Sequence, residues 1–264
     1  MNERTAKRRL VAGALALALA AGGVSAVVLA ANPVTCTGGP CTGTAQRDEI
    51  TGTDGDDQID ALAGFDLVEA GDGDDTLNGG PGQDEMYGGP GDDTYFGGDN
   101  WDQLREDEDV DSDDVMHGGP GLDNIEGGGG DDQIYGEEGD DGFGTDPNLS
   151  GGPGDDLVDG GPGNDSFIGD QGDDTLVGGE GDDFIFASLG DSKGAVDTIS
   201  CGPGNDEVTA NRSDIIIDDP GNDDVCETVH LVGKAKKAKA AKHAEKAGKH
   251  RAWTASPAGG RADR

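Results

Sequence analysis

Residues 79–105 read GGPGQDEMYGGPGDDTYFGGDNWDQLR, which is a nine-residue frame repeated three times. Each unit has Gly at positions 1 and 2, Asp at position 6 and an apolar residue at position 8. The frame extends back without a break to Gly43, so that seven consecutive units cover residues 43–105. A fixed short period held this long predicts a solenoid, in which each repeat stacks on its neighbours.

The frame resumes three more times along the chain. After insertions at 106–108, 145–150 and 187–191, further units cover residues 109–144, 151–186 and 192–209. Position 8 is apolar in all seventeen units. Position 6 is Asp in all seventeen: Asp48, Asp57, Asp66, Asp75, Asp84, Asp93, Asp102, Asp114, Asp123, Asp132, Asp141, Asp156, Asp165, Asp174, Asp183, Asp197 and Asp206.

These units resemble the RTX (hemolysin-type) calcium-binding repeat, GGxGxDxUx, in which U is an apolar residue. The resemblance covers residues 43–209. It implies an all-β fold, a parallel β-roll (a β-helix solenoid) in which two nonapeptides make one coil. It also implies that the first six residues of each unit turn around calcium and that the last three form a short strand.

The residue types support calcium binding independently of the resemblance. Calcium takes six to eight oxygen ligands from carboxylates and carbonyls, and glycine lets a tight turn expose its carbonyls. With two units per coil, Asp75 and Asp93 would be stacked neighbours, about one strand spacing (roughly 4.8 Å) apart. Carboxylates this close repel each other unless a cation lies between them. The seventeen aspartates are therefore candidate ligands, and we expect about ten to fourteen calcium ions.

Two other positions of the frame bear on the predicted calcium sites. Position 4 is not Gly at Gln46, Asn100, Ser112 and Ala195, all near block ends, where we expect weaker sites or none. Asp at position 5, as in Asp56, Asp74 and Asp92, alternates to the outside of the roll and is expected to be solvated.

Composition and charge favour a chain whose folding depends on cations. Gly accounts for 50 residues, aromatic residues make up 4%, and the formal net charge is −38. Residues 10–232 hold only four of the 18 Lys and Arg but 53 of the 56 Asp and Glu. Such a chain is expected to be disordered without a cation and ordered with calcium, and nucleic acid is not expected as a partner.

The N-terminal residues predict export. Arg4 to Arg9 form a positive region, and an apolar Ala- and Leu-rich stretch follows, so residues 1–31 are interpreted as a signal peptide. An N-terminal anchor is the alternative, because about 20 apolar residues can span a bilayer. The protein is therefore expected to be extracellular, either secreted or associated with the cell surface. RTX proteins usually carry a C-terminal secretion signal, which argues against a toxin-like role.

Four cysteines in an exported chain predict disulfides. Cys36 and Cys41 lie in the segment 32–42, interpreted as an N-terminal linker, and Cys201 and Cys226 flank the last repeats. Three connectivities are open, of which pairing between near neighbours is the simplest. The segment 210–232, with the run Ile215–Ile217, is interpreted as a C-terminal cap without an Asp at position 6, and Asp223 and Val225 return to the frame.

Residues 233–264 form a Lys- and Ala-rich tail with no apolar face, so we expect this basic tail to be disordered. Its charge favours attachment to an anionic cell-envelope polymer, or a solubilising role. The sequence contains no His-Glu-x-x-His helix and no Gly-x-Ser-x-Gly elbow, and His117 is expected at the surface, so no enzymatic activity is predicted. The alternatives are an adhesion or matrix protein tethered by the tail, and the accessory repeat region of a secreted enzyme or toxin.

Overall fold

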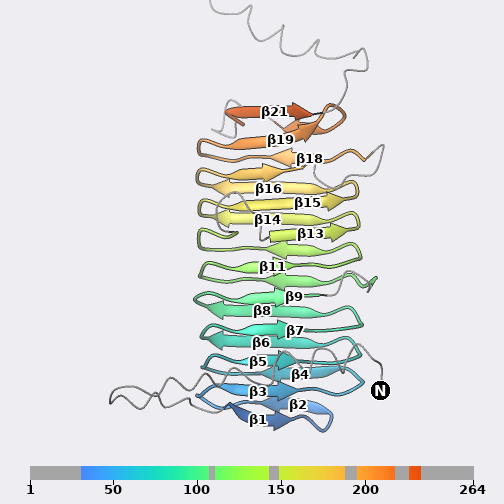
Figure 1. Cartoon of the computed structure of the whole chain (residues 1–264), viewed down its shortest axis with the longest axis vertical. Helices are drawn as coiled ribbons and strands as arrows, with labels where there is room; N and C mark the ends of the chain where they lie inside the picture. The colour runs from blue at the N-terminus through green and yellow to red at the C-terminus, as the bar shows by residue number, and fades with distance from the viewer. Residues whose placement is uncertain (1–30, 107–110, 143–148, 188–194, 218–225, 233–264) are drawn as a thin grey trace, which may run out of the picture. The chain divides into compact units, whose positions relative to one another are not determined.

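The computed structural model describes residues 31–106, 111–142, 149–187, 195–217 and 226–232. These residues form a parallel β-solenoid of two sheets, in which consecutive strands belong alternately to one sheet and to the other. Figure 1 shows the coils following one another from β1 in blue to β21 in orange-red. The all-β parallel roll predicted from the repeat is therefore confirmed.

The strands are short, because only the last few residues of each unit are extended. The first sheet has eleven strands: β1 Asn32–Thr35, β3 Asp48–Thr51, β5 Leu67–Glu69, β7 Glu85–Tyr87, β9 Gln103–Arg105, β11 Asn124–Glu126, β13 Leu149–Pro153, β15 Ser166–Gln171, β17 Phe184–Phe186, β19 Glu207–Asn211 and β21 Thr228–Val232. The second sheet has ten: β2 Gly39–Thr42, β4 Asp57–Asp60, β6 Thr76–Pro81, β8 Thr94–Asp99, β10 Val115–His117, β12 Gln133–Tyr135, β14 Leu157–Pro162, β16 Thr175–Glu180, β18 Thr198–Ser200 and β20 Ile215–Ile217.

The register between coils survives all three insertions. Within a block, strands pair at a separation of 18 residues, as where Val68 lies opposite Met86. Across the first insertion Tyr95 lies opposite Met116, and across the last Leu176 lies opposite Ile199. The insertions therefore do not shift the pairing of the strands on either side of them.

One insertion boundary differs from the predicted frame. The frame put Phe143 at the inward position of its unit, but Leu149 takes this place, opposite Ile125 and Phe167. Leu149 is fully buried, whereas Phe143 lies outside the described residues.

The core consists of two columns of inward side chains, one from each sheet. They are Leu149 and the position-8 residues of the other units, such as Ile50, Met86, Tyr95 and Phe167, and each is at most 1% exposed. A period of two along the strand turns the flanking residues outward, so each coil contributes one large apolar side chain per sheet. The roll is therefore thin, and its stability cannot rest on apolar burial alone.

The first coil corrects the interpretation of residues 32–42 as a linker. In the structure β1 pairs with β3 and β2 pairs with β4, so this segment is part of the solenoid. Val34 lies opposite Ile50, and Cys41 lies opposite Ile59. The Cys36–Cys41 disulfide joins β2 to the residue that follows β1, and both cysteines belong to the buried core.

The C-terminal cap also continues both sheets, through β20 and β21. Ile216 lies opposite Ile199 and packs against the core, whereas Ile215 and Ile217 are 54% and 46% exposed, so only the middle residue of the run faces inward. The second disulfide, Cys201–Cys226, ties this end to the last repeat. Both bonds follow the near-neighbour connectivity.

Residues 1–30 of the predicted signal peptide and the basic tail lie outside the described residues, as do Asp223 and Val225. Among the residues that are described, no helix is long and apolar enough to cross a membrane.

Candidate metal centre

The seventeen position-6 aspartates form two stacked columns, one along each edge of the roll. Each is the sixth residue of its unit, each except Asp141 begins or immediately precedes a strand, and each is at most 3% exposed. One edge holds Asp48, Asp66, Asp84, Asp102, Asp123, Asp141, Asp165, Asp183 and Asp206, and the other holds Asp57, Asp75, Asp93, Asp114, Asp132, Asp156, Asp174 and Asp197. Carboxylates are rarely buried so fully unless a partner compensates for the lost water.

Each column is a continuous hydrogen-bond ladder. The backbone N–H of one aspartate donates to Oδ1 of the aspartate one coil further on, as Asp66 does to Asp84 at 2.8 Å. Fifteen such bonds, of 2.7–3.1 Å, join the seventeen residues. All six that cross an insertion are present, so the predicted stacking of alternate units extends over the whole roll.

The second carboxylate oxygen has no protein partner in most of the ladder. Oδ2 is buried without a hydrogen bond in Asp66, Asp75, Asp84, Asp93, Asp102, Asp123, Asp132, Asp141, Asp156, Asp165 and Asp183. A buried acceptor left unsatisfied destabilises the fold, and a charged one does so more strongly. The repetition of this unsatisfied atom at equivalent positions indicates a ligand common to the coils.

Backbone carbonyls converge on the same space as the free oxygens. A Cβ added to Gly79 would lie 2.6 Å from the carbonyl oxygen of Gly97 and 2.7 Å from Oδ2 of Asp84. A Cβ on Gly82 would lie 2.0 Å from the carbonyl oxygen of Gly64. The repeat glycines thus leave room where a carboxylate and carbonyl oxygens of adjacent coils approach one another.

The donor set fits a hard cation such as calcium. In the described part of the chain, no three His, Cys, Asp or Glu side chains group closely enough to hold a metal by themselves. An ion between coils would therefore be held by aspartate carboxylates together with backbone carbonyls, which are oxygen ligands that calcium accepts.

Burial changes the acidity of the ladder. It raises the pKa of Asp84 from an ordinary value of 3.8 to about 7, and the pKa values of Asp93 and Asp102 to about 8. The hydrogen bond from the amide of the preceding coil lowers each pKa, and the nearby aspartate carboxylates raise it. Near neutral pH the ladder therefore holds protons or needs cations.

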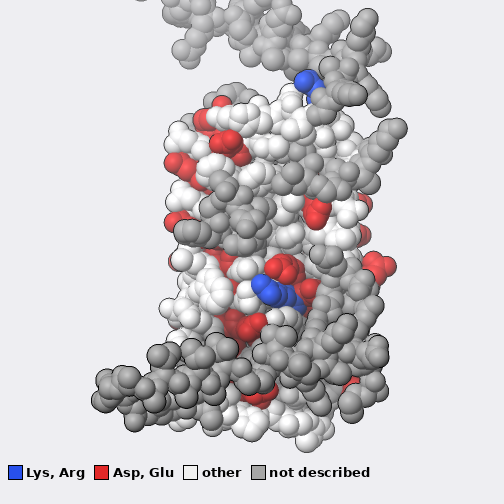
Figure 2. All heavy atoms as spheres, viewed as in Figure 1, with Lys and Arg blue, Asp and Glu red and all other residues white. Residues whose placement is uncertain are grey.

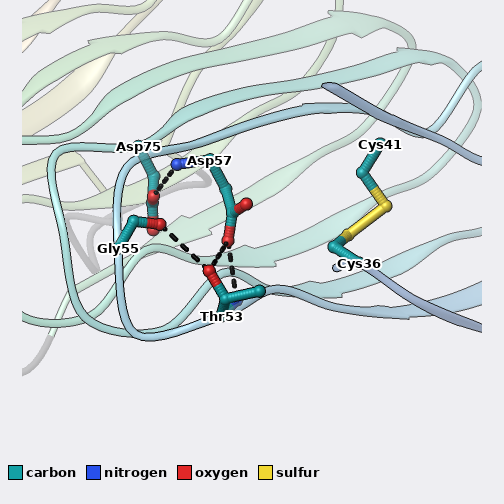
Figure 3. The surroundings of a disulfide bond; sticks show 6 residues. All are labelled: Cys36, Cys41, Thr53, Gly55, Asp57 and Asp75. Atoms are coloured by element: carbon teal, nitrogen blue, oxygen red, sulfur yellow. Dashed lines mark hydrogen bonds between the residues drawn. A yellow bond between two sulfur atoms is a disulfide. The ribbon is translucent and has the colours of Figure 1, made fainter. Parts of the chain in front are cut away.

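The N-terminal turns are closed by threonines. The N–H and hydroxyl of Thr53 donate to Oδ2 of Asp57 at 2.6 and 2.9 Å (Figure 3). The N–H of Thr44 donates to Asp48 in the same way. Both threonines stand at position 2, where later units have mostly Gly, and this departure from the frame is the signal in the sequence that could have identified them.

The C-terminal end adds two carboxylates that sequence reasoning missed. Asp214 Oδ1 accepts from the N–H of Asp197 at 3.4 Å, and Glu227 Oε2 accepts from the N–H of Asp206 at 2.8 Å. The prediction of a cap without an Asp at position 6 was wrong, because Asp214 stands two residues before the inward Ile216. Counting back from each apolar residue, and not forward from the last unit, would have found it.

Glu106 is a further departure within the roll. The frame placed it in the first insertion, but its N–H donates to the carbonyl of Glu126 in register with the coils. Its carboxylate accepts from the N–H groups of Gly88 and Gly89 and from the buried hydroxyl of Tyr95. One coil thus has a glutamate at the position where most units have glycine.

A parallel β-roll with two ladders of buried aspartates belongs to the class of cation-binding repeat solenoids. The model of the RTX calcium-binding nonapeptide repeat matches residues 42–68, 69–104, 110–143, 150–185 and 159–192, more than half of the chain. The chain belongs to this family, whose repeats bind calcium. No curated protein matches the chain.

Proposed function

We propose that this chain is an exported, non-enzymatic calcium-binding protein that folds when calcium bridges its aspartate ladders. The observation that carries the proposal is the buried, unpartnered Oδ2 of eleven ladder aspartates, Asp66 and Asp84 among them, beside converging backbone carbonyls. Calcium would provide each of these oxygens with the partner that the protein lacks.

Coupled folding follows from the balance of charge and apolar burial. Seventeen carboxylates are buried along the edges of the roll, whereas its core contains only one large apolar side chain per sheet and coil. On the face that Figure 2 shows, acidic side chains are also exposed at several places, and basic ones are few. Without cations the folded state would have to bury this charge or protonate it, so binding free energy becomes folding free energy.

Two disulfides support export, because such bonds persist in oxidising compartments. The non-enzymatic part of the proposal rests on the sequence, which has no His-Glu-x-x-His helix and no Gly-x-Ser-x-Gly elbow. Fusing residues 1–31 to a phosphatase that is active only outside the cytosol tests export. An inactive fusion would contradict it.

Calcium titration tests the binding and folding parts together. In chelator we expect a coil spectrum in far-ultraviolet circular dichroism, and with millimolar calcium a β spectrum. Calorimetry should give about ten or more ions per chain. Magnesium is the control, because it demands octahedral geometry and loses its water reluctantly. A chain already folded in chelator above about pH 8, where the ladder carboxylates are ionised, or one that binds fewer than about three ions, would contradict the proposal.

A further inference from the structure

The two edges of the roll differ at position 5, the residue just before each ladder aspartate. Along one edge this position forms a second, exposed ladder, in which the N–H of each residue bonds to the Asp Oδ1 one coil earlier, as Asp74 does to Asp56 at 3.2 Å. This ladder continues through Asp92, Asp113, Asp131, Asp155 and Asp173.

Along the other edge the same position carries no acid over five consecutive coils. It is occupied in turn by Arg47, Phe65, Gln83, Trp101 and Leu122, before the acids return at Asp140. Phe65 is 61% exposed, Trp101 42% and Leu122 47%. The roll does not need apolar side chains here, because the equivalent turns of the opposite edge are built with Asp. Aromatic residues are scarce in this chain, so an exposed row of apolar side chains indicates an interaction site.

The row borders an open groove of about 260 Å³. Its lining includes Arg47, Phe65, Gln83, Glu85, Trp101 and Gln103. Phe65 and Trp101 stand two coils apart, roughly 9.6 Å at two strand spacings. The groove thus has two aromatic rings two coils apart, with amides, a guanidinium and the carboxylates of Asp66, Asp84 and Glu85 placed among them.

The chemistry of this groove fits a neutral polysaccharide. One face of a sugar ring presents C–H groups that pack on an aromatic face, while the hydroxyls at its rim accept and donate hydrogen bonds. A polymer with a regular repeat can contact both rings, which stand at a regular interval. Nucleic acids and acidic glycans are disfavoured, because a chain of net charge −38 repels them. We propose that the groove between Phe65 and Trp101 binds a neutral, linear polysaccharide.

The test uses the full chain in millimolar calcium. Probes are hexasaccharides of β-1,4-linked glucose, N-acetylglucosamine and mannose, with an acidic polygalacturonate as contrast, and binding is measured by calorimetry. At least one neutral hexasaccharide should bind, and Trp101→Ala and Phe65→Ala should each weaken binding about tenfold. Phe96→Ala is the matched control, because Phe96 is also 42% exposed but lies on β8 outside the groove, and it should leave affinity unchanged.

Circular dichroism confirms that each variant still folds with calcium. The proposal is overturned if no neutral hexasaccharide binds, if polygalacturonate binds more tightly than all of them, or if Phe96→Ala weakens binding as much as Trp101→Ala. Sedimentation velocity provides a further check. A dimer that Trp101→Ala dissociates would show that the row is an interface between copies of this chain, and would also overturn it.

Discussion

The backbone N–H of Asp66 donates to Oδ1 of Asp84, 18 residues later, at 2.8 Å, while Oδ2 of Asp84 is buried without a partner. One carboxylate thus has two tasks. Its first oxygen joins successive coils, and its second is left for a cation. Since the hydrogen bond needs only an acceptor, whereas the cation needs charge, the two tasks can be separated by substitution.

Asp84→Asn should therefore keep the ladder and lose calcium. The amide oxygen can still accept from Asp66, but the charge is gone, so we expect one or two fewer ions by calorimetry. The change also removes one negative charge from the ladder and so reduces the repulsion between its carboxylates. Folding should therefore begin at a lower calcium concentration. Asp74→Asn, in the exposed outer ladder, is the control and should leave the ion count unchanged. Equal losses in both variants would contradict this division of tasks.

Gly163→Ala should disrupt the roll. A Cβ there would lie 1.3 Å from the carbonyl oxygen of Gly139, a backbone atom of the adjacent coil that cannot move freely. We expect destabilisation of about 3 kcal/mol or more, measured by thermal unfolding in calcium. Gly55 stands at the same position of its unit with nothing within 4 Å of an added Cβ, so Gly55→Ala should be tolerated. A stable Gly163→Ala protein would show that the coils are not packed as described.

Stability without calcium should fall as pH rises. The folded-state pKa values of Asp93, Asp102 and Asp123 are raised from 3.8 to about 8, so the folded ladder binds more protons than the unfolded chain. The stabilising effect is fully present below pH 3.8 and is lost as pH rises through about 8. In chelator, β structure should therefore decrease over this window.

Folding induced by calcium should depend on pH in the opposite direction, because calcium and protons compete for the same carboxylates. The calcium concentration at the folding midpoint should rise as pH falls from 8 towards 6. Circular dichroism at each pH measures both effects. A midpoint that is independent of pH would mean that the ladder carboxylates are not the ligands.

Loss of the Cys201–Cys226 disulfide should destabilise the C-terminal coils. This bond closes 25 residues, which corresponds to about 3 kcal/mol in the chain-entropy model. Replacing both cysteines by serine should lower the thermal midpoint in calcium. The Cys36–Cys41 bond closes only five residues, so its removal should cost less, about 2 kcal/mol. The reverse order would argue that the first coil is the weaker end.

Much of the site could be predicted from single positions. Asp at position 6 and the apolar residue at position 8 recur in phase, and a residue that repeats with the coil must occupy the same place in every coil. The exposed row of Phe65 and Trp101 was also present in the sequence, at position 5 of alternate units. It is recognisable only when alternate units are assigned to the two edges of the roll and each edge is compared with the other. The frame failed at Leu149, Asp214 and Glu227, where the spacing between coils changes.

The sequence by itself determined the solenoid, its two aspartate columns and its apolar core, because a strict period leaves the stacked chain one consistent arrangement. Only the tertiary structure decided how Asp93 meets Asp114 across an insertion, and which residues close the ends. Those contacts depend on the register at which the strands on either side of an insertion pair. Pairing between coils sets this register, and local residue preferences do not. The orphaned Oδ2 atoms and the groove at Trp101 likewise arise only when coils stack, since each is formed by residues about 18 or more positions apart.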